Sequence, residues 1–213
     1  MKLYLSSYGL GNQPEKFTSL IDGNKRTAII ANAWDLSTPE ERAGGLPEKL
    51  KVLRRLGLKP EELDLRDYFK HQDLLEKKIK EFGALWILGG NSFVLLRAMN
   101  MSGFTHYIVP LVLSNEIVFA GYSAGAVAAT PDLHGIELVD DPLHVPEGYN
   151  KQTPWKGLGL VDFRIAPHYR SNHPESEATE QVVKYFKDNK LPYKTLHDGE
   201  ALVIHGKSVE LVS

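Results

Sequence analysis

The stretch Ile117-Val118-Phe119-Ala120-Gly121-Tyr122-Ser123-Ala124-Gly125-Ala126 decides how this chain folds. Its first half is a continuous apolar run, which is typical of a strand covered on both faces. Only small residues follow Ser123, and this pattern is typical of a sharp turn that leads from a strand into a closely packed helix. The stretch therefore predicts one strand–turn–helix unit of an α/β fold.

The same alternation of strands and helices extends in both directions from this unit. Apolar runs at residues 3–7, 26–33 and 84–88 predict further buried strands, and apolar residues at helical spacing lie between them. No repeat, low-complexity stretch or linker interrupts the pattern. We therefore predict one α/β domain over residues 1–213, built on a mostly parallel sheet.

Four segments have weaker patterns. We expect a short strand at 63–68, a helix that begins at Pro47, irregular structure over 131–160, and two or three antiparallel strands over 193–211. We place Pro47 at a helix start because proline has no amide hydrogen. In the first turn this causes no loss, since the N–H groups there have no partner within the helix. The segment 131–160 is rich in Pro, Gly, Asp and His, so we expect part of a substrate wall there.

Composition and charge exclude several classes of protein. The formal net charge of −2 gives no electrostatic footprint for nucleic acid. The chain has no cysteine, which excludes disulfides, thiolate metal sites and a cysteine nucleophile. The N-terminus is too short and polar for a signal sequence, and no apolar run is long enough to cross a bilayer. A cytoplasmic location is expected.

Ser123 is the strongest candidate for a chemical role. A serine at a tight strand-to-helix turn is held in a strained backbone conformation that exposes its hydroxyl, and small residues two positions away on each side allow the strand and helix to approach. The alternative is that Ser123 only caps the helix. Capping accounts for the serine but not for both Gly121 and Gly125, so we favour a nucleophile.

A second glycine-containing loop follows the predicted strand at 84–88. It reads Gly89-Gly90-Asn91-Ser92-Phe93, and its glycines allow backbone N–H groups to face a cavity. In serine hydrolases such a loop provides one oxyanion donor, and the amide after the nucleophile, here Ala124, provides the other. A phosphate-binding turn is the alternative, but the loop lacks the Gly-x-Gly-x-x-Gly spacing and a following lysine.

A serine nucleophile also needs a base and an acid that orients the base. Among the eight histidines, His168 is favoured because it ends a predicted strand after Pro167, where it would reach the same sheet edge as Ser123. Asp198 is the preferred acid, although Asp198-Gly199 alone is more typical of a hairpin turn. Glu200 and Glu137 are the alternatives.

Three motifs together resemble a known family. Gly-Gly-Asn-Ser-Phe at 89–93, Gly-Tyr-Ser-Ala-Gly-Ala at 121–126 and Pro-His-Tyr at 167–169 are similar, in residues and spacing, to peptidase E, the aspartyl dipeptidase group that includes cyanophycinase. The resemblance covers nearly the whole chain. It implies a three-layer α/β/α fold with a mostly parallel sheet, of the class I glutamine amidotransferase type, with serine in place of cysteine.

The resemblance also implies roles for individual residues. It makes Ser123 the nucleophile and His168 the base, with the amides of Gly90 and Ala124 as the oxyanion hole. Asp198 matches the family's third member with a shorter side chain. The resemblance also leaves open a carboxylate between the serine and the histidine as the third member, and Glu137 and Asp140 are the nearest residues here. Substrate contacts are expected from Asn91 and Arg170, with Arg164 as the alternative cation.

Together these features predict a serine-type peptidase for small peptides, including dipeptides with an N-terminal acidic residue. The alternatives are a small-molecule esterase or amidase with the same triad, and a non-catalytic ligand-binding domain that keeps the turn as scaffold. No cofactor is expected, and no metal, because the chain has no His-Glu-x-x-His or similar ligand cluster. The expected partner is a small peptide, not nucleic acid or membrane, and a homodimer is compatible with the sequence.

Overall fold

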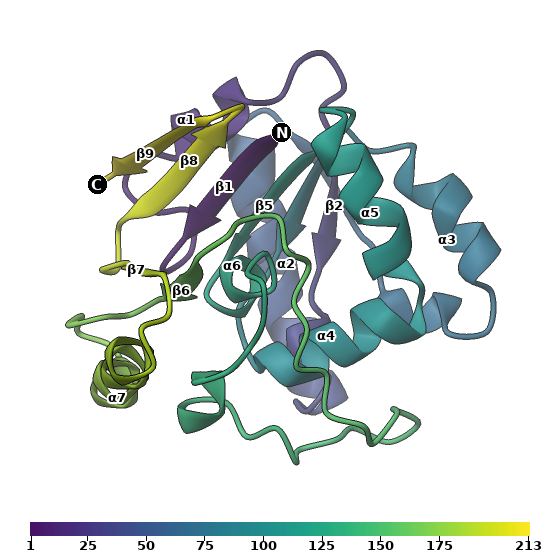
Figure 1. Ribbon diagram of the computed structural model, residues 1–213. Coiled ribbons are helices and arrows are strands. Elements are labelled where there is room, and N and C mark those ends of the chain that lie inside the picture. Colours follow the sequence, from purple (N-terminus) through teal and green to yellow (C-terminus); the bar gives the residue numbers. More distant parts are fainter.

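A central sheet of seven strands, with helices on both faces, organises the chain in the computed structural model, which describes residues 1–213 (Figure 1). The strand order is β3-β2-β4-β5-β1-β8-β9. The first five of these strands are parallel, and β8 and β9 are antiparallel additions at one edge. The prediction of a mostly parallel α/β sheet is therefore confirmed.

The strands are short, as buried parallel strands commonly are. Those of the central sheet are β1 (Lys2–Ser6), β2 (Arg26–Ile30), β3 (Lys59–Glu62), β4 (Ala84–Ile87), β5 (Val118–Tyr122), β8 (Ala201–His205) and β9 (Ser208–Val212). A separate parallel pair is formed by β6 (Arg164–Ala166) and β7 (Tyr193–Thr195).

The helices form two layers. They are α1 (Pro14–Ser19), α2 (Pro39–Arg55), α3 (Gln72–Ile79), α4 (Ser92–Met101), α5 (Phe104–Leu113), α6 (Ala124–Val127) and α7 (Ser176–Asp188), with short 3-10 turns η1 (Asn32–Trp34), η2 (Leu65–Tyr68) and η3 (Ile136–Leu138). Helices α1 and α2 lie behind the sheet in Figure 1, and α4, α5 and α6 lie in front of it. No helix combines the length and the apolar character that crossing a bilayer requires.

Alternating strand residues supply two hydrophobic cores, one on each face of the sheet. Leu85 and Ile87 of β4 belong to the larger core, with apolar residues from α3 to α7, whereas Trp86 belongs to the smaller core with α1 and α2. Because both faces are covered, β4 and β5 are buried along their whole length. This explains why they read as continuous apolar runs.

The parallel register brings three chain segments to one sheet edge. Ser6 of β1 lies opposite Tyr122 of β5, and Ile87 of β4 lies opposite Gly121. The residues that follow these strands therefore emerge side by side at the carboxyl edge, where α/β sheets commonly bind ligands.

Two predicted elements were placed wrongly. The strand is Lys59–Glu62, not 63–68, and it precedes the 3-10 turn η2. The helix around Pro47 begins earlier, at Pro39, because Thr38 and Glu41 form a reciprocal capping box: each side chain accepts the other's backbone N–H. Pro47 consequently lies inside α2.

The C-terminal tail confirms the prediction in part. Only β8 and β9 form the expected antiparallel hairpin, whereas β7 pairs in parallel with β6, away from the central sheet. Residues 131–160 are irregular, as predicted, apart from η3 and an isolated bridge between Asp132 and Lys156.

Candidate active site

Ser123 occupies the turn between β5 and α6 in a strained backbone conformation. Its φ is 49° and its ψ is −117°, a region that non-glycine residues rarely adopt. Strain of this kind persists only where the surrounding structure enforces it, and it is concentrated at functional sites. The side chain makes no capping hydrogen bond to α6. Capping therefore does not explain why a serine stands here.

The glycines around Ser123 are required by close packing. A Cβ atom on Gly125 would lie 2.4 Å from the carbonyl oxygen of Ile87, and one on Gly121 would lie 2.9 Å from the same oxygen. Gly89 of the neighbouring loop is equally constrained, because its Cβ would lie 2.9 Å from the Cβ of Ser123. Contacts below 3.0 Å force a shift of the backbone, so only glycine fits at these positions.

Ser123 and His168 line one cavity of about 160 Å³. His168 follows β6 and is 1% exposed. Tyr8, Trp34, Gly90, His173 and Glu175 are also in the cavity wall. Ser123 and His168 thus come from segments 45 positions apart to a common space, as the sequence pattern predicted.

Asp198 holds the imidazole of His168 from the side opposite its Nε2 atom. The His168 Nδ1 and Asp198 Oδ1 atoms are 2.7 Å apart. A carboxylate at this position keeps the proton on Nδ1 and leaves Nε2 free to accept one. The arrangement is that of a base and its orienting acid.

Ser7, just after β1, connects the three candidate residues. Its hydroxyl donates a hydrogen bond of 2.8 Å to Asp198 Oδ1 and accepts one of 2.8 Å from the backbone N–H of His168. Its carbonyl oxygen accepts the backbone N–H of Ser123 at 3.1 Å. Ser7 is fully buried, so these bonds are shielded from water. The sequence interpretation did not single out Ser7.

Burial is the main influence on the charge state of His168. It lowers the pKa of His168 below the usual 6.5, while Asp198 acts in the opposite direction through its hydrogen bond and its charge. The imidazole of His173 is stacked on that of His168, with ring centroids 3.7 Å apart, and it also lowers the His168 pKa. Glu175 Oε2, 3.8 Å from His168 Nε2, raises it. A neutral His168 is therefore favoured at neutral pH.

Two backbone amides are available to hold a developing oxyanion. None of the hydrogen bonds of the loops, turns and helix ends uses the N–H of Gly90 or Ala124 as donor. Gly90 has a φ of 128°, and a Cβ there would lie 2.7 Å from the carbonyl oxygen of Ala33. The loop therefore needs glycine at this position. Gly90 and Ala124 each line a cavity that Ser123 also lines.

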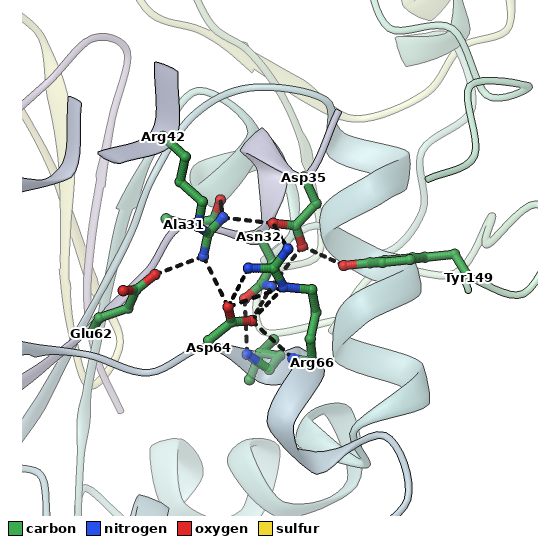
Figure 2. A network of polar contacts seen from close by, with 9 residues as sticks. Ala31, Asn32, Asp35, Arg42, Glu62, Asp64, Arg66 and Tyr149 are labelled. Atoms are coloured by element: carbon green, nitrogen blue, oxygen red, sulfur yellow. Dashed lines mark hydrogen bonds and ion pairs between the residues drawn. The ribbon is translucent and has the colours of Figure 1, made fainter. Parts of the chain in front are cut away.

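A polar network surrounds Asp35 and Asp64 after β2 and β3 (Figure 2). Asp35, whose side chain is 1% exposed, accepts hydrogen bonds from Arg42 at 2.6 Å and from Asn32 at 2.7 Å. Asn32 also donates to Asp64 at 2.9 Å, and the hydroxyl of Tyr149 donates to Asp35. Asn32 is the first residue of η1, and Asp35 follows Trp34, its last residue. The network therefore fixes both ends of this turn, which carries Trp34 of the cavity wall, and Tyr149 ties the irregular segment 131–160 to it.

Ser123 also lines a second, narrow recess of about 20 Å³. Its wall includes Asp140, Glu175, Ala124 and apolar residues such as Val182. Burial raises the pKa of Asp140 to about 6, although its carboxylate accepts the backbone N–H of Ser92 at 2.8 Å. The space is sufficient for about one water molecule.

The chain's relationship to known proteins agrees with this geometry. The model of peptidase family S51 matches residues 15–212. The chain belongs to peptidase family S51. The protein is therefore a peptidase of the serine type.

Individual S51 relatives share much of the chain. An uncharacterized peptidase of Listeria monocytogenes is 31% identical over 91% of this chain and 88% of its own length. The protein named peptidase E of Streptomyces coelicolor is 30% identical over 68% of this chain and 57% of its own. A "Probable alpha-aspartyl dipeptidase" of Drosophila melanogaster is 30% identical over 64% and 56%.

A solved structure extends the S51 likeness to the fold. The crystal structure of a protein from Listeria monocytogenes, provisionally named peptidase E, superposes with a TM-score of 0.79 at 28% identity. The match covers 99% of this chain and 97% of that one. The three-layer fold implied by the sequence motifs is thereby confirmed.

The predicted substrate contacts of this S51 peptidase lie outside the two cavities. Asn91 caps α4, accepting the N–H of Val94 at 2.9 Å and donating to the carbonyl of Asp141 at 3.1 Å. Arg170 is exposed, lies over the ring of Tyr169 and faces Glu180 at 3.7 Å. Arg164 is paired with Asp132 at 2.5 Å. The structure does not bring these three side chains to Ser123.

The alternative acids have other contacts. Glu200 accepts the N–H of His197 at 2.7 Å, and Glu137 accepts that of Gly135 at 2.6 Å. Neither lines a cavity with His168, whereas Asp140 shares only the narrow recess with Ser123.

Three residues of the cavity wall, Tyr8, Trp34 and Glu175, were not identified from the sequence, and neither was Ser7. Polar and aromatic residues at the ends of β1 and β2 were the only signal for the first two.

His168, His173 and Glu175 have ligand atoms within 4.8 Å of one another and are the group most able to hold a metal ion. The orientation of these side chains does not suit a metal ion. The two imidazole rings are nearly parallel, at 9°, so their lone pairs do not converge on a common point. In addition, His173 Nδ1 accepts the backbone N–H of Glu175 at 3.2 Å.

Proposed function

We propose that this S51 peptidase hydrolyses short peptides through Ser123, His168 and Asp198, with an acyl-enzyme intermediate. The observation that carries the proposal is the chain of contacts on His168. Its Nδ1 is bound to a carboxylate at 2.7 Å, and its ring shares a cavity with a strained, uncapped serine. Serine catalysis requires a base that is oriented by an acid and lies near the nucleophile, so these contacts support the proposal.

In the proposed reaction, the Ser123 oxygen attacks the scissile carbonyl carbon while His168 Nε2 takes the hydroxyl proton. The carbonyl oxygen becomes an oxyanion and accepts hydrogen bonds from the amides of Gly90 and Ala124. His168 then gives its proton to the leaving nitrogen as the C–N bond breaks. Water, deprotonated by His168, then adds to the acyl carbon, and the bond from that carbon to the Ser123 oxygen breaks as His168 returns its proton to this oxygen. Asp198 stabilises the imidazolium at each stage.

The charges around Ser123 bear on the substrate. Glu175 lines both cavities, Asp140 lines the narrow recess, and neither cavity wall contains a lysine or arginine. This supports recognition of a free α-ammonium group and disfavours a negatively charged side chain beside it. The small volume of the narrow recess favours a small side chain on the N-terminal residue of the substrate. We therefore propose short peptides with a small, uncharged N-terminal residue as substrates. Dipeptides with an N-terminal aspartate are the second candidate, favoured by the names of two relatives.

Labelling and a substrate panel test the proposal together. A fluorophosphonate should label the protein at Ser123, because this reagent reacts with activated serines. Ala-Xaa dipeptides should be cleaved with a kcat/KM at least about 10-fold above that of the matching Asp-Xaa dipeptides, since like charges cost about a kcal/mol or more at close range.

Each unfavourable result has a distinct meaning. Absence of labelling and of peptide cleavage would reject catalysis by Ser123 and leave a ligand-binding domain. Faster cleavage of Asp-Xaa would reject only the substrate class. Cleavage of p-nitrophenyl esters without any peptide would point to the esterase or amidase alternative with the same residues.

The fall of kcat/KM at acid pH should follow the protonation of His168. Only neutral imidazole can accept the Ser123 proton, so kcat/KM should fall by about tenfold per pH unit below the His168 pKa. Because burial lowers that pKa, the limb should lie below pH 6.5. Asp140 also titrates near 6, so the Asp140→Asn variant is the control. A limb that disappears in this variant would contradict the assignment to His168.

A further inference from the structure

A groove of about 550 Å³ lies apart from Ser123, between α4, the start of α5 and residues 150–157. We call it the Arg97 groove. It shares no lining residue with either cavity at Ser123. The polar side chains in its wall belong to Arg97, Asn100, Thr105, Asn150, Gln152, Thr153 and Lys156. The proposed peptidase mechanism uses none of them.

Arg97 is a buried cation without an anionic partner. It is 2% exposed, although it lines the groove. Its Nε donates to the carbonyl of Asn150 at 3.0 Å, and its Nη2 donates to the carbonyl of Pro142 at 2.6 Å. Its Nη1 is buried and has no hydrogen-bond partner. Buried charges are normally paired, and buried donors are normally satisfied.

A purely structural role explains only part of this arrangement. Two bonds to carbonyl oxygens hold the irregular segment 131–160 against α4, and a neutral donor would be sufficient for that purpose. They leave the positive charge uncompensated and one donor unused. Burial also lowers the pKa of Arg97, and no neighbouring carboxylate acts in the opposite direction. An anion at the groove would supply the missing counter-charge.

Two asparagine side chains of the groove have amide groups free to donate. The Oδ1 atom of Asn100 already accepts the hydroxyl of Thr105 at 2.9 Å, and the Oδ1 atom of Asn150 accepts the N–H of Gln152 at 2.9 Å. Internal bonds thus occupy both carbonyl oxygens and leave the two NH₂ groups available. Lys156 adds a second cation, and the wall contains no aspartate or glutamate.

We propose that the Arg97 groove binds a small organic anion through a carboxylate or phosphate group. Arg97, Lys156 and the amides of Asn100 and Asn150 would hold the oxyanion. Trp155, which lines the groove and is 36% exposed, offers an apolar surface to the rest of the ligand. The volume is in the range of small-molecule sites.

The test is a binding titration of the full-length protein at constant ionic strength, with chloride as the reference salt. Inorganic phosphate and N-acetyl-tryptophan are the two probes, and calorimetry and thermal unfolding are the readouts. At least one probe should bind saturably and raise the unfolding temperature, because a ligand of the folded state stabilises it. The probe that binds more tightly identifies phosphate or carboxylate as the preferred group.

Variants connect the binding to this groove. Lys156→Gln and Asn100→Ala should each weaken binding by about 10-fold, the effect of losing one hydrogen bond to a charged group. Lys151→Gln is the matched control, because Lys151 is exposed on the same segment but does not line the groove. These variants keep Arg97, whose removal could unfold the segment. Absence of saturable binding of both probes, or equal losses in Lys156→Gln and Lys151→Gln, would overturn the proposal.

Discussion

Replacement of Ser123 by alanine should lower kcat by about 10⁴- to 10⁶-fold, because the hydroxyl is the proposed nucleophile and no other group can take its place. The variant should fold normally. Alanine keeps the Cβ atom that packs against Gly89, and the hydroxyl makes no capping bond whose loss would destabilise α6. Steady-state hydrolysis of the best dipeptide measures the loss, and circular dichroism verifies the fold.

The control for this variant is Ser208→Ala. Ser208 is an exposed serine of β9, far along the sheet from β5, so its replacement should leave kcat unchanged. Fluorophosphonate labelling should be lost in Ser123→Ala and retained in Ser208→Ala. If Ser123→Ala keeps wild-type activity or labelling, another group performs the chemistry and the proposed mechanism is wrong.

Some residues of the candidate site could be predicted from the sequence and others could not. Ser123 was found because its signal is local: an apolar strand, a serine and two glycines within a few positions. His168 was found because it ends a short strand after Pro167. Ser7 was missed because its role arises from pairing of β1 with β5 and β8, which brings together residues as much as 191 positions apart. No local pattern records such contacts.

The errors in the fold have similar causes. Strand β3 consists of Lys59, Pro60, Glu61 and Glu62, which have low strand propensity. It is an edge strand, where proline and charged residues are tolerated because one side has no partner. The strand is therefore set by pairing with β2 and not by its own composition. The pairing of β7 could not be predicted for the same reason. Its partner β6 lies about 30 positions earlier in the chain, so β7 was grouped with the antiparallel strands that follow it.

The Asp198→Asn variant should lower kcat by about 10³- to 10⁴-fold while leaving the fold intact. Asparagine can still accept hydrogen bonds from Ser7 and from His168 Nδ1, so the ring can keep its position. What is lost is the negative charge that stabilises the imidazolium formed during the reaction. That charge matters because His168 is 1% exposed and water cannot replace it. Steady-state kinetics across pH measure the effect.

The pH profile of Asp198→Asn separates an electrostatic role from a structural one. Asp198 raises the His168 pKa against the effect of burial, so its neutralisation should move the acid limb of kcat/KM to lower pH as the maximum rate falls. A merely distorted site would lose rate without this shift. Glu200→Gln is the matched control, since Glu200 lies in the same turn but binds only the backbone of His197. If Glu200→Gln, Glu137→Gln or Asp140→Asn shows the large loss and Asp198→Asn does not, the orienting acid is that residue, and the bond from Asp198 to His168 serves only to hold the ring.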